Sequence, residues 1–498
     1  MNIDFKRPWI VILTLMITAV GISYALFLTQ SLRLDEAQTL WQTNRYPAGI
    51  LHVVGQDVHV PLYHLMVHFW QLLFGNSIEV VRLFSLAFFV ASIPVLFLIA
   101  QEMFGSKRIS SLAATLFTLS PFMNWYGNEA RMYSMLVFFT LLNQYYFVRL
   151  RTKSSALIWL GYTLTAILGI YTHYYFGLVL VTQALFYLFN STSFNKGSLW
   201  KLLMSALLVL LAIAPWLLYV HHLGSISNSE PLLMRPTLID IFNTFAQYIF
   251  GIQSVPINSF IVALWPLIML TWLFSLEKRK DRSVDTRYLL LSVIVPIFLS
   301  FIISILVRPV FQERYLIYTL PAFSLLIAAM IDSYSDFTRR SIRIGLIVCL
   351  LVALVVVRAN PNTPTKEDYR AVAEHLHAEA NPQDVVIVSA PFTIYPLEYY
   401  YQGPSVLSTL PIWNQYVTGP IPPFDSNTFP TQVQTVTGSH QRAWLLLSYD
   451  QGYEDAIRTY FDNHYERLEY FTISPKMTLA LYKIRYDTSE AIYATPSP

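Results

Sequence analysis

The chain has 498 residues, of which 55% are hydrophobic and only 13% are charged, and its mean hydropathy is +0.46. A water-soluble fold cannot bury that much apolar surface, so the composition excludes an ordinary soluble protein. The formal net charge of +3 is too small to indicate a nucleic-acid partner. The single cysteine, Cys349, excludes an internal disulfide.

Apolar runs of about 18 to 22 residues recur along the chain, the length that a helix needs to cross roughly 30 Å of hydrocarbon. The first run follows Lys6 and Arg7. Because no small-residue cleavage site comes after it, we interpret it as a retained span rather than a removed signal. We predict about eleven transmembrane helices, near residues 9–30, 79–100, 109–126, 132–149, 156–171, 173–190, 201–221, 259–276, 287–307, 313–331 and 341–357.

The basic residues between these spans fall on one side of the membrane if the N-terminus is cytoplasmic, as the positive-inside rule expects. They lie in alternate loops, at Lys107 and Arg108, Arg149 to Lys153, Lys196 and Lys201, Lys278 to Arg282, and Arg339 to Arg343. We therefore predict a multi-pass protein, and we expect a bacterial inner membrane. The extracytoplasmic side receives the first loop (31–78), the turn at 126–133 and the tail after Val357.

Within the first loop, four apolar residues repeat at helical spacing over a stretch too short to span the membrane. This pattern indicates a helix that lies along the membrane surface and covers the region next to Asp35. The residues are Leu62, Leu65, Met66 and Phe69.

The composition turns polar after Asn360, Pro361 and Pro364, which marks a linker. We predict a membrane domain at 1–357 and an extracytoplasmic domain at 358–498. In the latter, alternating strand and helix patterns indicate a small α/β fold. The predicted elements are a helix with the face Tyr369, Val372 and Leu376, strands at 384–389 and 442–449, and a helix at 453–464.

Two adjacent carboxylates, Asp35 and Glu36, follow the first span at its extracytoplasmic end. One could act as a general base towards a hydroxyl while the other orients that hydroxyl or holds a cation. A solvated helix end is the alternative interpretation. The sequence leaves a divalent cation open and indicates no other cofactor.

Further along the first loop, Asp57, His59 and His64 could contribute a ligand or a substrate contact. No metal-binding spacing such as His-Glu-x-x-His occurs among them, so we favour hydrogen bonding at the membrane interface over a metal site.

A second pair of charges, Glu129 and Arg131, stands in the turn between two predicted spans, flanked by Tyr126 and Tyr133. An interfacial tyrosine belt with an incidental ion pair would explain the pattern. We favour a joint site with the Asp35 loop, because this topology places both on the same side of the membrane.

The last extracytoplasmic cluster contains Arg308 and residues 312–315, with Arg314 at the start of the tenth span. Arginine suits a phosphate because its planar fork gives two donors and a permanent charge. Snorkelling to lipid headgroups is the alternative. His173, between the fifth and sixth spans, is more typical of a hydrogen-bonded polar residue than of a catalyst.

The chain has no nucleotide-binding glycine motif, and activated nucleotides are ordinarily absent outside the cytoplasm. An activated substrate must therefore arrive by another route. A lipid phosphate carrier fits, because its tail can lie between spans while its phosphate meets Arg314 and its headgroup faces Asp35.

Four motifs occur in a characteristic order over residues 1–357: Leu34-Asp35-Glu36-Ala37, Asp57 to Trp70 with its Pro-Leu-Tyr-His core, Asn128 to Tyr133, and Glu313-Arg314-Tyr315. Thr172-His173-Tyr174-Tyr175 is a weaker fifth. In this order they resemble the GT-C superfamily of membrane glycosyltransferases, most of all the protein mannosyltransferase and aminoarabinose transferase type, family 39.

This resemblance implies a polytopic GT-C fold and an inverting transfer of a hexose or pentose from a polyprenyl phosphate to a protein, lipid or glycan acceptor on the outer face. It also assigns roles to individual residues. Asp35 would be the base, with Glu36 beside it, and Glu129 would position the donor or acceptor. Arg314, Tyr315 and Arg131 would bind the donor phosphate, and substrate contacts would come from Asp57, His59, Tyr133 and His173.

The main alternative is a transporter or flippase that moves a lipid-linked sugar without forming a bond. Transporters tend to show paired halves and polar residues near the bilayer midplane. Here the charges gather at one interface and neither half repeats the other. A third possibility, an inactive membrane subunit of a polymer-assembly system, is disfavoured by the intact Asp-Glu and Arg-Tyr motifs.

Overall fold

The computed structural model describes residues 8–57, 59–153, 155–195, 197–223, 234–253, 256–259, 261, 284–359, 367–416 and 421–484. These residues form two compact units, which we describe separately. The first unit combines residues 1–29 with 42–365 and is helical. The second joins the segment Gln30–Trp41 to the chain after residue 365 and contains a β-sheet.

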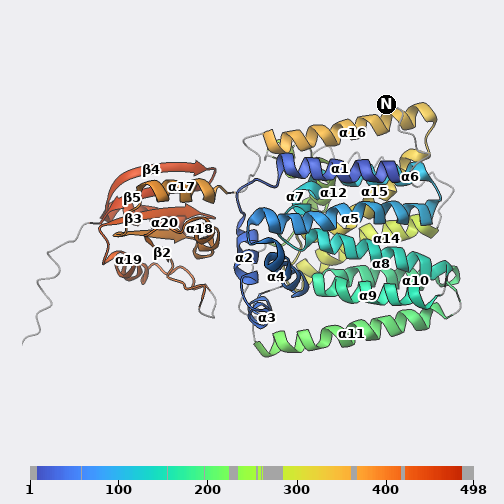
Figure 1. Ribbon diagram of the computed structural model, residues 1–498, viewed down its shortest axis with the longest axis horizontal. Coiled ribbons are helices and arrows are strands. Elements are labelled where there is room, and N and C mark those ends of the chain that lie inside the picture. Colours follow the sequence, from blue (N-terminus) through green and yellow to red (C-terminus); the bar gives the residue numbers. More distant parts are fainter. Residues whose placement is uncertain are drawn as a thin grey trace, which may run out of the picture. The chain divides into compact units, whose positions relative to one another are not determined.

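Long apolar helices build the first unit, and several run nearly parallel to one another (Figure 1). Within it, α5 packs against α8, α8 against α9, and α9 against α11. The helices are α1 (Pro8–Leu26), α3 (Pro47–Gly55), α4 (Leu62–Phe74), α5 (Ile78–Phe104), α6 (Lys107–Leu119), α7 (Pro121–Gly127), α8 (Tyr133–Thr152), α9 (Ala156–Thr172), α10 (Phe176–Phe189), η1 (Ser191–Ser193), α11 (Ser198–Leu223), α12 (Leu238–Phe250), α14 (Val284–Leu306), η3 (Glu313–Thr319), α15 (Leu320–Asp332) and α16 (Asp336–Ala359).

Helices occupy ten of the eleven predicted spans, and the eleventh, at 259–276, lies almost entirely outside the described residues. Within the described part of the chain, six helices are long and apolar enough to cross a membrane: α1, α5, α11, α14, η3 with α15, and α16. Two more, α9 and α10, are apolar but shorter. The chain is thus a multi-pass membrane protein, while the number eleven stays a prediction.

The predicted surface helix is present as α4, but the pattern of burial differs from its apolar face. Tyr63, His64, Val67 and Gln71 are its buried residues. By contrast, the side chain of Phe69 is 54% exposed. The buried face of α4 is therefore offset from the predicted one, in which Leu62, Leu65 and Met66 are half-buried and Phe69 is exposed.

The second unit is a three-layer α/β fold around a five-stranded sheet of order β2-β1-β3-β5-β4. The first three strands of that order are parallel, and β5 and β4 run antiparallel. The elements are α17 (Tyr369–Glu379), β1 (Asp384–Ser389), η4 (Pro391–Thr393), α18 (Ile394–Tyr400), β2 (Val406–Thr409), α19 (Phe429–Thr437), β3 (Arg442–Ser448), α20 (Glu454–His464), β4 (Glu466–Ser474) and β5 (Met477–Lys483).

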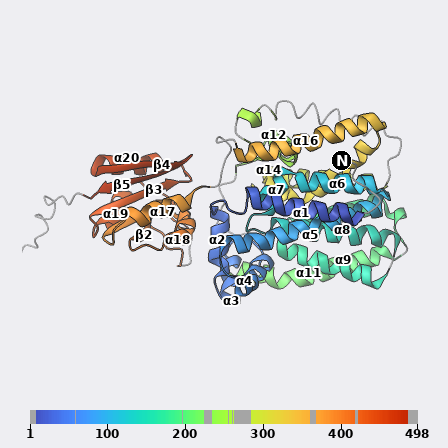
Figure 2. The ribbon, with the colours of Figure 1, turned by 45° about the horizontal axis from the view of Figure 1, so that its top comes forward.

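Helices cover both faces of this sheet (Figures 1 and 2). On one face, α17 and α18 pack over Val386, Trp444 and Leu479, and on the other α19 and α20 pack over Ile387 and Leu445. Every residue of β1 is buried, as expected for a central parallel strand covered on both sides. The predicted fold class, a helical polytopic membrane protein with a C-terminal α/β domain, is confirmed.

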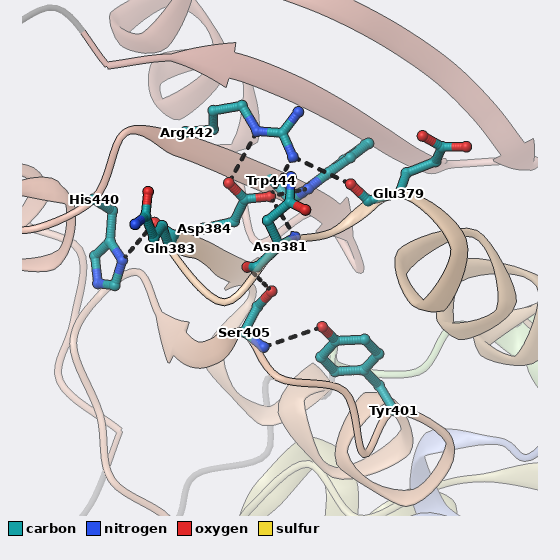
Figure 3. Close-up of polar contacts among 9 residues, drawn as sticks. All are labelled: Glu379, Asn381, Gln383, Asp384, Tyr401, Ser405, His440, Arg442 and Trp444. Carbon is teal, nitrogen blue, oxygen red and sulfur yellow. Dashed lines mark hydrogen bonds and ion pairs between the residues drawn. The ribbon is translucent and has the colours of Figure 1, made fainter.

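A buried carboxylate, Asp384, connects the start of β1 to its neighbours (Figure 3). Its oxygens accept hydrogen bonds from the Arg442 guanidinium at 2.9 and 2.7 Å and from the Asn381 backbone at 2.9 Å, and the Trp444 indole donates a longer one at 3.3 Å. Ser405, beside β2, donates to the Asn381 carbonyl. The Asp384 side chain thus joins the starts of β1 and β3, and Asn381 extends this network to Ser405 beside β2.

We expect Asp384→Ala to lower the free energy of unfolding by about 3 kcal/mol. The substitution removes a buried carboxylate, so the N–H donors of Arg442 and Trp444 lose their acceptor. Calorimetry of the full-length protein in detergent would measure this loss. Asp455→Ala, which removes an exposed ion pair with Arg458, is the control and should cost less than about 1 kcal/mol. Equal losses in the two variants would contradict this account of Asp384.

Candidate functional site

A buried arginine lies at the centre of the polar cluster in the first unit. The side chain of Arg131 is only 4% exposed, and its Nη2 donates to Nε2 of His59 at 2.5 Å. Because arginine has no acceptor, the His59 Nε2 must accept and therefore carries no proton in this arrangement. The Asp57 carboxylate lies near the same atom, with 3.8 Å between its Oδ2 and the His59 Nε2, and it accepts a hydrogen bond from Gln42.

The backbone around Arg131 is fixed by contacts to two other helices. The turn between α7 and α8 is tight, since the Arg131 N–H donates to the Glu129 carbonyl at 2.7 Å. The Ser85 hydroxyl on α5 donates to the Arg131 carbonyl at 3.3 Å. That hydroxyl also hydrogen-bonds the Tyr63 phenol on α4 at 2.8 Å. Helices α4 and α5 therefore hold the turn that presents Arg131.

A group of aromatic rings joins this turn to the segment that carries the second arginine. The Tyr315 ring lies 6.5 Å from that of Tyr133, 5.1 Å from that of His173 and 5.4 Å from that of Tyr175. The guanidinium of Arg314 lies over the Tyr315 ring at 5.5 Å. Arg314 thus lies beside the same aromatic group as Tyr133, two residues after Arg131.

The Arg314 segment is ordered by hydrogen bonds on each side of it. Before it, the Ser304 hydroxyl at the end of α14 accepts from the Val310 and Phe311 amides. After it, the Tyr248 phenol on α12 donates to the Leu316 carbonyl at 2.9 Å. Tyr248 also lines an apolar groove between α6, α12, α15 and α16, whose other lining residues include Leu116, Ile249, Phe323, Ile327 and Leu350.

The second unit contains the two adjacent carboxylates, at the start of α2 (Leu34–Thr43). Glu36 stands at the third helical position, and its Oε2 accepts the Arg33 backbone N–H at 3.0 Å. This is the reach-back half of a capping box, which satisfies a donor that the helix itself leaves open. Glu36 thus has a structural role at the start of α2, one position after Asp35.

The structure therefore brings together most of the predicted site residues. Asp57, His59, Arg131, Tyr133, His173, Arg314 and Tyr315 are linked by the contacts given above, and Glu129 is fully buried in the same turn. Asp35 and Glu36 belong to the other unit. Among the described residues, no group of three His, Cys, Asp or Glu side chains could hold a metal ion.

The sequence did not single out several residues that hold the cluster. They are Gln42, which donates to Asp57, Ser85, which donates to the Arg131 carbonyl, and Tyr175, whose ring contacts those of His173 and Tyr315. Tyr175 could have been found, since it ends the Thr-His-Tyr-Tyr motif. Gln42 and Ser85 carry no such signal.

A comparison with protein families indicates the class of protein to which this chain is similar. The family model "dolichyl-phosphate-mannose-protein mannosyltransferase" matches residues 58–219, which include His59, Glu129, Arg131, Tyr133 and His173. No curated protein sequence matches the chain. The family match and the fold confirm the predicted resemblance to the GT-C superfamily, and the family match indicates that the chain is a glycosyltransferase.

Two solved structures have the same fold along nearly the whole chain. ArnT from Cupriavidus metallidurans bound to undecaprenyl phosphate is 13% identical, with a TM-score of 0.58, and the alignment covers 98% of this chain and 99% of that one. The archaeal oligosaccharyltransferase AglB from Archaeoglobus fulgidus, in complex with an inhibitory peptide and a dolichol-phosphate, is also 13% identical, with a TM-score of 0.52, and covers 97% and 75%.

The cluster also contains a histidine that we expect to stay neutral. Burial lowers the pKa of His64 on α4 well below its usual value of 6.5, and the charge of Arg131 acts in the same direction, opposed by Asp57 and by a backbone hydrogen bond with Val60. The His64 ring stacks against that of His59, with 6.1 Å between their centroids.

Protonation of His64 should therefore accompany unfolding in acid. As the pH falls through 6.5, the unfolded chain takes up a proton at this position and the folded chain does not, so stability falls with falling pH by up to about 1.4 kcal/mol per pH unit. We expect His64→Gln to flatten the fall in thermal midpoint between pH 6.5 and 5.5. His222→Gln, at an exposed position of α11, is the control. An unchanged slope in His64→Gln would contradict the assignment.

Proposed function

We propose that this protein transfers a sugar from a polyprenyl phosphate carrier to an acceptor hydroxyl on the extracytoplasmic face of the membrane, with inversion at the anomeric carbon. The observation that supports this most is the aromatic group in which the Tyr315 ring, under the Arg314 guanidinium, packs against His173 and against Tyr133 in the turn that follows Arg131. Two permanent charges at the ends of apolar helices suit an anionic headgroup whose tail remains in the lipid.

The donor is the part of the proposal with the most support. An apolar groove runs beside the Tyr248 side chain, whose phenol also holds the Arg314 segment through Leu316. The isoprenoid tail would stay in the lipid beside the apolar helices while its phosphate meets Arg314 and Arg131. ArnT is bound to undecaprenyl phosphate and AglB to a dolichol-phosphate, and these ligands favour the same class of carrier here.

In the proposed reaction, Asp35 accepts the proton of the acceptor hydroxyl. The acceptor oxygen then forms a bond to the anomeric carbon while the bond from that carbon to the phosphate oxygen breaks, and the electron pair leaves with the phosphate. Attack from the face opposite the leaving group inverts the configuration. The arginines stabilise the charge that grows on the phosphate, which is often the largest catalytic contribution.

The remaining predicted residues take supporting roles in this proposal. Asp57 and His59 orient Arg131, and Glu129 and Tyr133 contact the substrates from the turn before α8. Glu36 has a structural role, because its Oε2 accepts the Arg33 backbone N–H. It would hold the start of α2 so that Asp35 keeps a fixed direction.

We expect Asp35→Asn to abolish transfer, because an amide cannot accept the proton, while leaving folding and donor binding close to wild type. The measurement is transfer from a radiolabelled panel of polyprenyl phosphate sugars to an envelope acceptor extract by purified protein. Asp455→Asn, which changes an exposed carboxylate of the second unit, is the control. Full activity of Asp35→Asn would move the base elsewhere. A wild type that binds the lipid but transfers nothing would favour the transporter.

Arg314→Ala should weaken binding of undecaprenyl phosphate by about tenfold to a hundredfold, the loss expected for a hydrogen bond to a charged group. Equilibrium binding to the labelled lipid phosphate in detergent would measure it. Arg340→Ala removes an exposed arginine from α16 and should leave the affinity unchanged. Equal affinities for wild type and Arg314→Ala would exclude Arg314 as the phosphate ligand.

A further inference from the structure

The segment that carries Asp35 folds as part of the second unit, although it follows the first transmembrane helix in sequence. Just before the carboxylates, the Leu32 backbone N–H donates to the Tyr400 phenol oxygen at 2.9 Å. Leu32 and Tyr400 are 368 positions apart. The end of α18 in the C-terminal domain thus holds the chain three residues before Asp35.

The far end of the same segment is held by aromatic contacts. The Trp41 indole lies 5.0 Å from the Tyr395 ring and 6.2 Å from the Tyr416 ring, measured between centroids. Both tyrosines are themselves supported, because Tyr395 packs edge-on against Trp413 and the Tyr416 hydroxyl donates to Glu398. Residues 32 to 41 are therefore fixed near each end by one domain.

The side chain that contacts Leu32 is itself ordered. The Arg370 guanidinium on α17 lies over the Tyr400 ring at 5.5 Å, and the Tyr399 ring packs edge-on against it at 5.0 Å. Ile394 and Leu397 anchor α18 in the core beneath the sheet face. Two side chains thus pack against the Tyr400 ring, which keeps its hydroxyl oxygen in a fixed position as a hydrogen-bond acceptor.

A third contact lies at the carboxyl end of β3. Tyr449 has a φ of 60°, an unfavourable conformation for a residue with a Cβ, and such strain is concentrated at positions with a task. Burial, a hydrogen bond to Glu367 and the charge of Asp35 raise the pKa of its phenol, and Arg33 opposes them. The Tyr449 side chain therefore lies within electrostatic range of Asp35.

We propose that the C-terminal domain is the positioning element for Asp35, with the Tyr400 hydroxyl and the Trp41 contact to Tyr395 and Tyr416 fixing the two ends of its segment. The proposal rests on the function proposed above, in which Asp35 is the base. Tyr400 is then a positioning residue that touches neither substrate. Its effect is on turnover, because a displaced base lowers the rate of proton transfer without changing how the lipid phosphate binds.

Tyr400→Phe tests this directly, because it removes one oxygen and keeps the ring. We expect kcat to fall about tenfold, while KM for the donor, the affinity for undecaprenyl phosphate and the thermal midpoint stay at wild-type values. Tyr470→Phe, on the edge strand β4 at the other side of the sheet, is the matched control and should retain full kcat. Trp41→Leu provides a second variant at the other end of the segment and should also lower kcat selectively.

The outcomes separate this inference from the proposed function. Wild-type kcat in both Tyr400→Phe and Trp41→Leu, together with an inactive Asp35→Asn, overturns the positioning role and leaves the base assignment intact. Full activity of Asp35→Asn overturns the base assignment itself. A fall in donor affinity of Tyr400→Phe that matches its fall in activity would also overturn the inference, since it would place Tyr400 at the donor.

Discussion

The organisation of the first unit depends on burying the charge of Arg131. A guanidinium does not lose its proton in a protein, so it must be given hydrogen-bond acceptors when it leaves water. Here the acceptor is His59, which comes from a loop 72 positions earlier, and Ser85 and Tyr63 fix the backbone that carries the arginine. Loop, α4, α5 and the α7–α8 turn are thus joined around one charge.

This constraint explains why the polar residues of the unit gather in one place. A charged group in a largely apolar helical bundle requires partners, and each partner that is drawn in brings its own polar atoms, as Asp57 does with Gln42. A second arginine, Arg314, lies over the Tyr315 ring, which packs against Tyr133 and His173. An ionised phosphate would meet donors that are already ordered, which reduces the cost of organising the site when a ligand binds.

Structure is predicted best from sequence where the hydrophobic pattern of a segment follows directly from its burial. β1 begins and ends at the predicted residues, 384 and 389, because a strand covered on both faces must be continuously apolar. β4 was not predicted, since most of its residues are exposed and its position depends on pairing with β5. On α4 the helix was predicted, but its buried face consists of Tyr63, His64, Val67 and Gln71 and not of the predicted apolar residues.

The same distinction applies to the site. The motifs identified Arg131 and His59 by residue type, but their contact follows from how α4, α5 and α8 pack, which no local pattern encodes. The segment at 30–41 is a stronger case, because its sequence continues from the first span and its fold belongs with residues after 365. A hydrogen bond such as that between Leu32 and Tyr400 leaves no trace in either stretch of sequence, since a backbone donor has no residue preference. Only the structure shows that Glu36, one of two adjacent carboxylates that look equivalent in sequence, accepts the Arg33 backbone N–H at the start of α2.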